Sequence, residues 1–197
     1  MLEAEYWSTG LRVAGIDEAG RGAWAGPVVA GAVILPPGNY PFRDSKAFPA
    51  KEREALYQYL TEVALAYGVG FAGVKEISHY GIVGATHKAA LRAIAALNPA
   101  PEQLITDYLF LKTHLPIVAL AKAENLSPSV GAASILAKVT RDWVMGRIAL
   151  RYPGYGLERH KGYGTRDHAR ALSRLGPSPV HRQTFRPVAG LNLPDPR

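Results

Sequence analysis

Two adjacent acids, Asp17 and Glu18, close a short apolar run, and a flexible basic turn, Gly20-Arg21-Gly22, follows them directly. Neighbouring carboxylates at the end of a buried strand are costly to ionise together, because each charge raises the energy of the other. A divalent cation or a shared proton relieves that cost. Taken alone, the pair is at least as typical of a solvated strand end that runs into a glycine turn.

Two more apolar runs also end in an acid. Asp107 follows the run from Leu104 to Thr106, and Glu124 comes shortly after the run from Ile117 to Ala121. Acids at the ends of strands in one sheet can converge on a common rim, where oxygen ligands suit Mg²⁺ or Mn²⁺. The chain has no cysteine, so a metal ion would be held by oxygen or imidazole. The convergence of the acids is a hypothesis at this stage.

The elements that must position these acids follow from the hydrophobic pattern. Leu11, Val13 and Ile16 predict the strand before the first acids, and a hairpin leads from it to a second apolar strand. The further strands and helices that we expect are residues 28–35, 51–66, 67–74, 77–97, 104–107, 117–121, 129–151 and 165–175. His79 and His87 lie on or near one of the helices without a carboxylate to complete a ligand set, so we interpret them as ordinary surface or packing residues.

Composition limits the class of protein. A chain of 197 residues, 48% of them hydrophobic, is long enough for one domain with a buried core. The first residues carry acids and show no export signal, and the longest uncharged stretch is broken by glycines and prolines, which argues against a membrane span. We therefore expect a cytoplasmic protein.

The positive charge is concentrated near the C-terminus. The net charge is +7, yet residues 138–197 alone hold 12 Lys and Arg against 4 Asp and Glu. A basic segment on a neutral body is typical of proteins that bind a polyanion such as nucleic acid, although it also serves solubility. On the helix 129–151, Ser134, Lys138 and Arg141 share a face that could hold phosphate, and residues 152–164 are rich in glycine, aromatic and basic side chains.

Seven sequence blocks follow one another along the chain. They are GIDEAGRGAWAGPVVAGAVIL from Gly15, DSK from Asp44, the acid at Asp107, KAE at Lys122, AASILAKVTRD from Ala132, YPGYGLERHKGYGT from Tyr152 and HRQTFRP from His181. These blocks, in this order, resemble ribonuclease HII, which cuts the RNA strand of RNA–DNA hybrids. The resemblance implies an α/β ribonuclease H-like fold. We expect a five-stranded mixed sheet flanked by helices, with strands one to three antiparallel. It also implies a catalytic domain in residues 1–150 and a helical C-terminal extension in residues 151–197 that packs on it and binds substrate.

In the family, four carboxylates bind two divalent ions, Mn²⁺ or Mg²⁺, and they correspond here to Asp17, Glu18, Asp107 and Glu124. The ions activate water and stabilise the leaving oxygen, so the implied products are a 5′-phosphate and a 3′-hydroxyl. Two positions depart from the family pattern. Tyr108 replaces the usual glycine after the third acid, so the local backbone there is expected to differ, and Glu124 stands where Asp is usual. The related ribonuclease HIII group uses Glu at that place.

The resemblance also implies how ribose is selected. The turn Gly20, Arg21 and Gly22 would read the 2′-hydroxyl by close backbone contact, and Tyr163 would stack on the sugar next to the scissile bond. Cleavage 5′ of single ribonucleotides in duplex DNA follows, with roles in ribonucleotide excision repair and RNA primer removal. For contacts to the nucleic-acid backbone we predict Lys46, Ser134, Lys138, His181 and Arg182. We expect a monomer and consider a sliding clamp as a partner.

Three alternatives stay open. The departures at Tyr108 and Glu124 are compatible with a protein of this fold that binds hybrids with weak or no catalysis. Glu124 is also compatible with specificity like that of ribonuclease HIII. A metal-dependent phosphatase or exonuclease could use the same acids on a different substrate.

Overall fold

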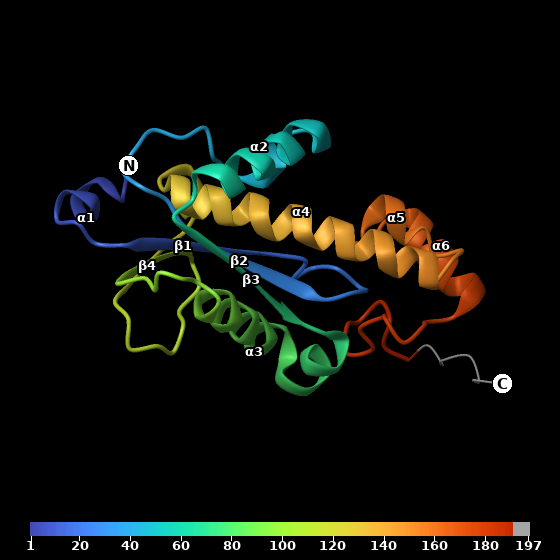
Figure 1. The fold of residues 1–197 in the computed structure, drawn as a ribbon. Coiled ribbons are helices and arrows are strands. Elements are labelled where there is room, and N and C mark those ends of the chain that lie inside the picture. The colour runs from blue at the N-terminus through green and yellow to red at the C-terminus, as the bar shows by residue number, and fades with distance from the viewer. Residues whose placement is uncertain (191–197) are drawn as a thin grey trace.

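A single five-stranded sheet forms the centre of the computed structural model, which describes residues 1–190 (Figure 1). Its strands are β1 (Val13–Ala19), β2 (Val28–Ile34), β3 (Ala66–Ala72), β4 (Gln103–Asp107) and β5 (Ile117–Leu120), in the spatial order β3-β2-β1-β4-β5. The first three strands pair antiparallel, whereas β4 lies parallel to β1 and β5 parallel to β4. The predicted mixed sheet with three antiparallel strands is confirmed.

Helices cover both faces of the sheet (Figure 1). Helix α3 (Val74–Ala95) packs on one face, and α4 (Pro128–Arg151) lies across the other with α2 (Ala50–Val63) beyond it. The remaining elements are α1 (Ala4–Ser8), the 3₁₀ turns η1 (Ser45–Ala47) and η2 (Ala123–Asn125), α5 (Leu157–His160) and α6 (Arg166–Leu175). No helix in residues 1–190 is both long and apolar enough to cross a membrane.

Strand β1 supplies side chains to both layers because successive residues point to opposite faces. Ala14 and Ile16 belong to the core under α3, and Val13 packs with Val130 of α4. On the α4 side, Gly15 lets the helix approach so closely that an added Cβ would overlap the backbone carbonyl of Ser129. This close contact fixes the position of α4 relative to the end of β1.

The predicted bounds of most helices and strands lie within a few residues of the observed bounds, with two exceptions. Leu11 was expected in the first strand, but β1 begins only at Val13 and Leu11 is exposed. The helix expected over 77–97 begins at Val74, and at Gly81 it is interrupted by a residue with φ 68° and ψ 168°. Glycine adopts this backbone conformation readily, so the chain bends there instead of forming one straight helix.

The part of the chain after α4 packs onto the C-terminal half of that helix. Leu157 of α5 and Leu172 of α6 share a hydrophobic cluster with Met145 and Ala149 of α4, and Ala25 from the β1–β2 loop joins them. These contacts support the predicted extension, and the division into a domain and an extension at residue 150 stays a prediction. Residues 191–197 of that predicted extension lie outside the described residues.

Candidate active site

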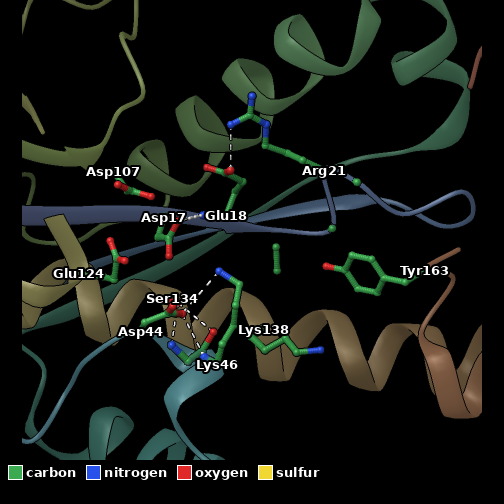
Figure 2. Close-up of a pocket in the computed structure, with 14 residues that line it drawn as sticks. Asp17, Glu18, Arg21, Asp44, Lys46, Asp107, Glu124, Ser134, Lys138 and Tyr163 are labelled. Atoms are coloured by element: carbon green, nitrogen blue, oxygen red, sulfur yellow. Dashed lines mark hydrogen bonds and ion pairs between the residues drawn. The ribbon is translucent and has the colours of Figure 1, made fainter. Parts of the chain in front are cut away.

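A cleft of about 520 Å³ opens at the end of β1, and all four predicted acids line it. Around them lie residues from the β1–β2 turn, the loop before η1, helix α4 and the segment after α5 (Figure 2). The residues lining the cleft are Asp17, Glu18, Ala19, Gly20, Arg21, Gly22, Asp44, Ser45, Lys46, Asp107, Glu124, Ser134, Lys138 and Tyr163. Segments more than a hundred residues apart in sequence therefore meet here.

Asp17 and Glu18 leave β1 on opposite faces. Asp17 points toward α4, and Glu18 points toward Arg21 (Figure 2), whose Nη1 lies 3.3 Å from Glu18 Oε1. The Asp17 carboxylate accepts a hydrogen bond from the backbone N–H of Glu18 at 2.7 Å. The alternation of the strand thus separates the two adjacent charges, so that they approach the cleft from two sides.

Asp107 and Glu124 come from the next strands of the same sheet edge. Ile16 of β1 pairs with Thr106 of β4, so the residues that follow, Asp17 and Asp107, emerge side by side. Asp107 Oδ1 accepts the backbone N–H of Lys122 at 2.8 Å, which anchors the chain just before Glu124. The parallel order of β1, β4 and β5 therefore produces the convergence that the sequence predicted.

Burial and mutual repulsion raise the pKa values of Asp17, Glu18 and Glu124. Burial first, and then the charge of Glu18, raise the pKa of Asp17 well above its usual value. Burial also raises the pKa of Glu18, against the lowering effect of Arg21. For Glu124, burial is again the main cause of a raised pKa, with Asp107 contributing. A cluster with this electrostatic profile gains stability from a bound cation.

The four acids have the chemistry to bind a divalent metal ion, but their side chains do not form a complete ligand set around one point. In residues 1–190, no group of three or more acids or histidines is placed to hold a metal ion together. Two carboxylate oxygens, Glu18 Oε2 and Glu124 Oε2, are nevertheless buried without any hydrogen-bond donor. Buried anionic atoms without donors are costly, and an oxygen-rich cleft is what Mg²⁺ or Mn²⁺ prefers. The four acids thus share a cleft rather than form a preassembled ligand cage.

The predicted substrate-contact residues divide into two groups. Seven of them line the cleft, namely Gly20, Arg21, Gly22, Lys46, Ser134, Lys138 and Tyr163. Lys46 is largely exposed, and its ammonium lies 3.6 Å from Asp44 Oδ1. Lys138 Nζ forms an ion pair with Asp142 Oδ1 at 2.6 Å, and the Ser134 hydroxyl donates to Ser45 Oγ.

His181 and Arg182, the other two, are buried, so the prediction that they contact the nucleic-acid backbone directly is wrong for this structure. His181 is 1% exposed and Arg182 is 0% exposed. Charged and polar side chains are rarely fully buried, and nothing in the block HRQTFRP indicates that these two are. Here they act inside the protein, where each has defined hydrogen-bond partners.

His181 belongs to a buried chain of hydrogen bonds that leads to Tyr163. The backbone N–H of Ser178 donates to His181 Nδ1 at 2.9 Å, so the proton of this ring must be on Nε2. That Nε2–H donates to His168 Nε2 at 3.1 Å, and His168 Nδ1–H donates to the Tyr163 carbonyl at 3.0 Å. Both rings are therefore held neutral. Burial lowers the pKa of His168 and lowers that of His181 to about 4.

Two buried arginines hold the loop between β1 and β2. Arg182 donates from Nη1 to the Arg21 carbonyl at 2.8 Å and from Nε to the Gly26 carbonyl at 3.0 Å. Arg141 of α4 donates to the carbonyls of Pro27 and Ala25 at 3.0 and 3.2 Å. Burial, and then the charge of Arg141, lower the pKa of Arg182 to about 9. Arg141, expected to face phosphate beside Ser134, is likewise fully buried.

Sequence reasoning assigned no site role to Asp44 and Ser45, which also line the cleft. Asp44 caps η1 by accepting the backbone N–H of Lys46 at 3.0 Å, and Ser45 is paired with Ser134. The loop reaches the cleft because Gly131 of α4 lets the backbone of Arg43 approach. The motif DSK was the only signal for these residues, and it does not by itself show what the loop touches.

Tyr108 has a φ of 50°, in the left-handed region that glycine adopts readily. The expectation that the local backbone differs from that of the family stays a prediction. The backbone N–H of Tyr108 donates to the Thr106 and Leu120 carbonyls, and its exposed ring packs against Phe110. The substitution therefore changes the surface beside Asp107 more than the position of Asp107 itself.

Comparisons with known proteins agree on one family. The family model described as Ribonuclease HII matches residues 14–188. A ribonuclease HII of Thermus thermophilus is 58% identical over 188 residues, which cover 95% of this chain and 93% of that protein. Among solved structures, ribonuclease H2 from Pyrococcus horikoshii OT3 gives a TM-score of 0.76 at 27% identity, over 90% of this chain and 95% of that one. The Bst ribonuclease HIII solved in complex with Mn²⁺ gives 0.67 at 19% identity, over 90% and 68% of the two chains.

Proposed function

Because this chain belongs to the ribonuclease HII family and is therefore a metal-dependent endoribonuclease, we propose that it hydrolyses the RNA strand of RNA–DNA hybrids and nicks duplex DNA 5′ of single embedded ribonucleotides. The reaction leaves a 5′-phosphate and a 3′-hydroxyl. The observation that carries the proposal is a single cleft in which four acids from β1, β4 and η2 face the Gly20-Arg21-Gly22 turn and Tyr163 (Figure 2).

The four carboxylates are the proposed metal ligands. Asp17, Glu18, Asp107 and Glu124 would hold two divalent ions, Mn²⁺ or Mg²⁺, and the buried donor-free oxygens of Glu18 and Glu124 support this assignment. When bound, such ions activate water, neutralise the phosphate and stabilise the leaving oxygen. Glu124 has one methylene more than Asp, and it reaches the cleft from η2 next to the anchored Asp107.

Other residues of the cleft orient the substrate. Lys46 places its ammonium group near Asp17 and Glu124, where it attracts the phosphates flanking the scissile bond. Lys138 lines the same cleft with its ammonium paired to Asp142, and it adds positive charge for the phosphates further from the acids. Tyr163 presents a partly exposed ring to the cleft, with the guanidinium of Arg141 5.2 Å from its centroid on the buried side. A ring supported in this way offers a flat surface for the sugar of the ribonucleotide.

Selection of ribose rests on the turn at residues 20–22. A 2′-hydroxyl is the group that distinguishes RNA from DNA at the cleavage site, and backbone groups can reach it only where no side chain intervenes. A Cβ added to Gly20 would overlap the Arg141 guanidinium, whereas one added to Gly22 would meet nothing within 4 Å in the protein. Gly20 is thus required by the protein's own packing, and Gly22 leaves space open toward the substrate.

The proposed partners are RNA–DNA hybrids and ribonucleotide-containing DNA. The basic residues after position 137 support this binding through contacts to phosphates. Binding to a sliding clamp, a monomeric state and the roles in repair and primer removal stay predictions from the sequence.

The decisive experiment uses two duplexes that differ by one 2′-hydroxyl. One carries a single ribonucleotide and the other carries deoxyribose at the same place, and both are incubated with Mg²⁺ or Mn²⁺. We expect a nick 5′ of the ribonucleotide and none in the control duplex. The Asp17→Asn protein should bind both duplexes and cut neither.

Each alternative gives a distinct result in this assay. Hybrid binding without cutting at any metal concentration would identify a non-catalytic binding protein. Equal cleavage of the two duplexes, or release of terminal nucleotides only, would identify a nuclease or phosphatase that does not read ribose. Cleavage of long hybrids with none at a single ribonucleotide would favour specificity like that of ribonuclease HIII.

A further inference from the structure

The turn at residues 20–23 faces the cleft. Its sequence allows two types of β-turn, and the structure shows one of them. The Gly20 carbonyl accepts the backbone N–H of Ala23 at 3.3 Å, which closes a β-turn with Arg21 and Gly22 at its centre. Neither central residue has a positive φ, so the turn is of type I. A glycine at the second central position favours type II instead, because that type needs a positive φ there.

The two turn types differ in the peptide that joins the central residues. Between type I and type II, this peptide rotates by about half a turn, which exchanges the directions of the Arg21 carbonyl and the Gly22 N–H. Because the peptide unit is planar and trans, these two groups always point in opposite directions. Any contact that fixes the carbonyl therefore fixes the N–H as well.

Among residues 1–190, one side chain makes such a contact. Arg182 Nη1 donates to the Arg21 carbonyl at 2.8 Å from the buried side, and its Nε donates to the Gly26 carbonyl. The Arg21 carbonyl thus points inward, and the Gly22 N–H points to the exposed side of the turn, where Gly22 lines the cleft. A guanidinium bound to two carbonyls of one loop also holds its own position.

We propose that Arg182 is a positioning residue for ribose recognition, which it supports by holding the Arg21–Gly22 peptide in the type I orientation. The inference rests on the proposed function, since it assigns a role within the same cleft. Arg182 does not touch the substrate. It determines whether a backbone donor or a backbone acceptor of the turn faces the sugar.

The backbone around Arg182 ties this role to the C-terminal part of the chain. The N–H of Arg182 donates to the Trp24 carbonyl, and the N–H of Gly26 donates to the Val180 carbonyl, both at 2.8 Å. The neighbouring His181 reaches the Tyr163 carbonyl through His168. Residues 178–182 therefore contact the turn at residues 20–22 directly and, through His168, the backbone of Tyr163.

The test compares Arg182→Lys and Arg182→Gln with Arg186→Gln. Arg186 lies four residues further along the chain, is exposed and is absent from the cleft, so its substitution removes the same charge without touching the turn. Cleavage and binding are measured on the two duplexes that differ by one 2′-hydroxyl. We expect both Arg182 variants to cut the ribonucleotide duplex roughly 10- to 100-fold more slowly at saturation, the range for losing one buried hydrogen bond.

The lysine variant separates charge from geometry. It keeps the positive charge and loses the planar fork, so its cleavage rate should fall nearly as far as that of the glutamine variant, while its duplex affinity stays that of the unmodified protein. A merely structural role would instead lower the unfolding temperature and leave the cleavage rate of the remaining folded protein unchanged. Cleavage by Arg182→Lys at the rate of the control would overturn the proposal.

A measurement on the unmodified protein keeps the inference testable if the variants do not fold. In a type I turn the nuclear Overhauser effect between Arg21 Hα and the Gly22 amide proton is weak, and in type II it is strong. We expect a weak effect in the unmodified protein and a strong one in Arg182→Lys. A strong effect in the unmodified protein would refute the inference, whereas failure to cut the ribonucleotide duplex would refute the proposed function alone.

Discussion

Protonation of the buried histidine chain should destabilise the fold in mild acid. His181 Nδ1 already accepts the Ser178 N–H, and its Nε2–H already donates to His168. Burial, and then repulsion from His168, lower the pKa of His181 from 6.5 to about 4. When the pH falls from about 7.5 to about 5, His181 gains a proton in the unfolded chain but stays neutral in the folded chain.

The size of the effect follows from these two pKa values. Where the folded pKa is the lower one, stability is complete above the unfolded value and is lost progressively as the pH falls toward the folded value. For His181 the loss amounts to about 2 kcal/mol by pH 5 and to about 3 kcal/mol once the pH is below 4. His168, whose pKa is also lowered by burial, adds to the loss in the same direction.

Urea unfolding at a series of pH values measures how the free energy of unfolding depends on pH. The His181→Gln substitution removes the titrating group that causes this dependence. Raised carboxyl pKa values, such as that of Glu18, act in the opposite direction, so the informative quantity is the difference between the two proteins. His114→Gln is the matched control, because His114 is exposed. We expect a flatter pH dependence only in His181→Gln. The same slope in all three proteins would refute the assignment of a neutral, hydrogen-bonded chain.

Four further outcomes are expected. Asp17→Asn should abolish cleavage and yet raise the urea midpoint of the metal-free protein near neutral pH, because burial disfavours the charged Asp17 carboxylate. Gly31→Ala should destabilise the protein by about 1–3 kcal/mol, since its Cβ would lie 2.5 Å from the Ala133 carbonyl oxygen. Gly146→Ala, in open space on α4, should stabilise it by about 0.5–1 kcal/mol in the same urea titrations. Lys46→Ala should reduce the slope of log affinity for duplex against log salt concentration by about 1, measured by fluorescence anisotropy.

Local patterns were sufficient for the strands and for the acids that end them. Apolar runs that end in Asp or Glu locate β1, β4 and the chain before η2, whereas the pairing that brings their ends together was implied by the resemblance to a known family. The alternation of side chains along a strand explains why Asp17 and Glu18 enter the cleft from different sides.

The sequence alone could not predict the features that depend on close contact between distant segments of the chain. Asp44 reaches the cleft only because Gly131 lets the loop pack on α4. The prediction that Arg182 contacts the nucleic-acid backbone fails because carbonyl groups of the β1–β2 loop surround its guanidinium, and only the fold shows them. The conformation of Tyr108 likewise depends on the contacts of its N–H with neighbouring strands.

Whether the four acids bind divalent cations at one place can be measured by anomalous diffraction at the manganese edge from crystals soaked in Mn²⁺. We expect anomalous density in the cleft within ligand distance of Asp17, and its loss in crystals of Asp17→Asn. Anomalous density only at sites outside the cleft would refute the proposed metal site.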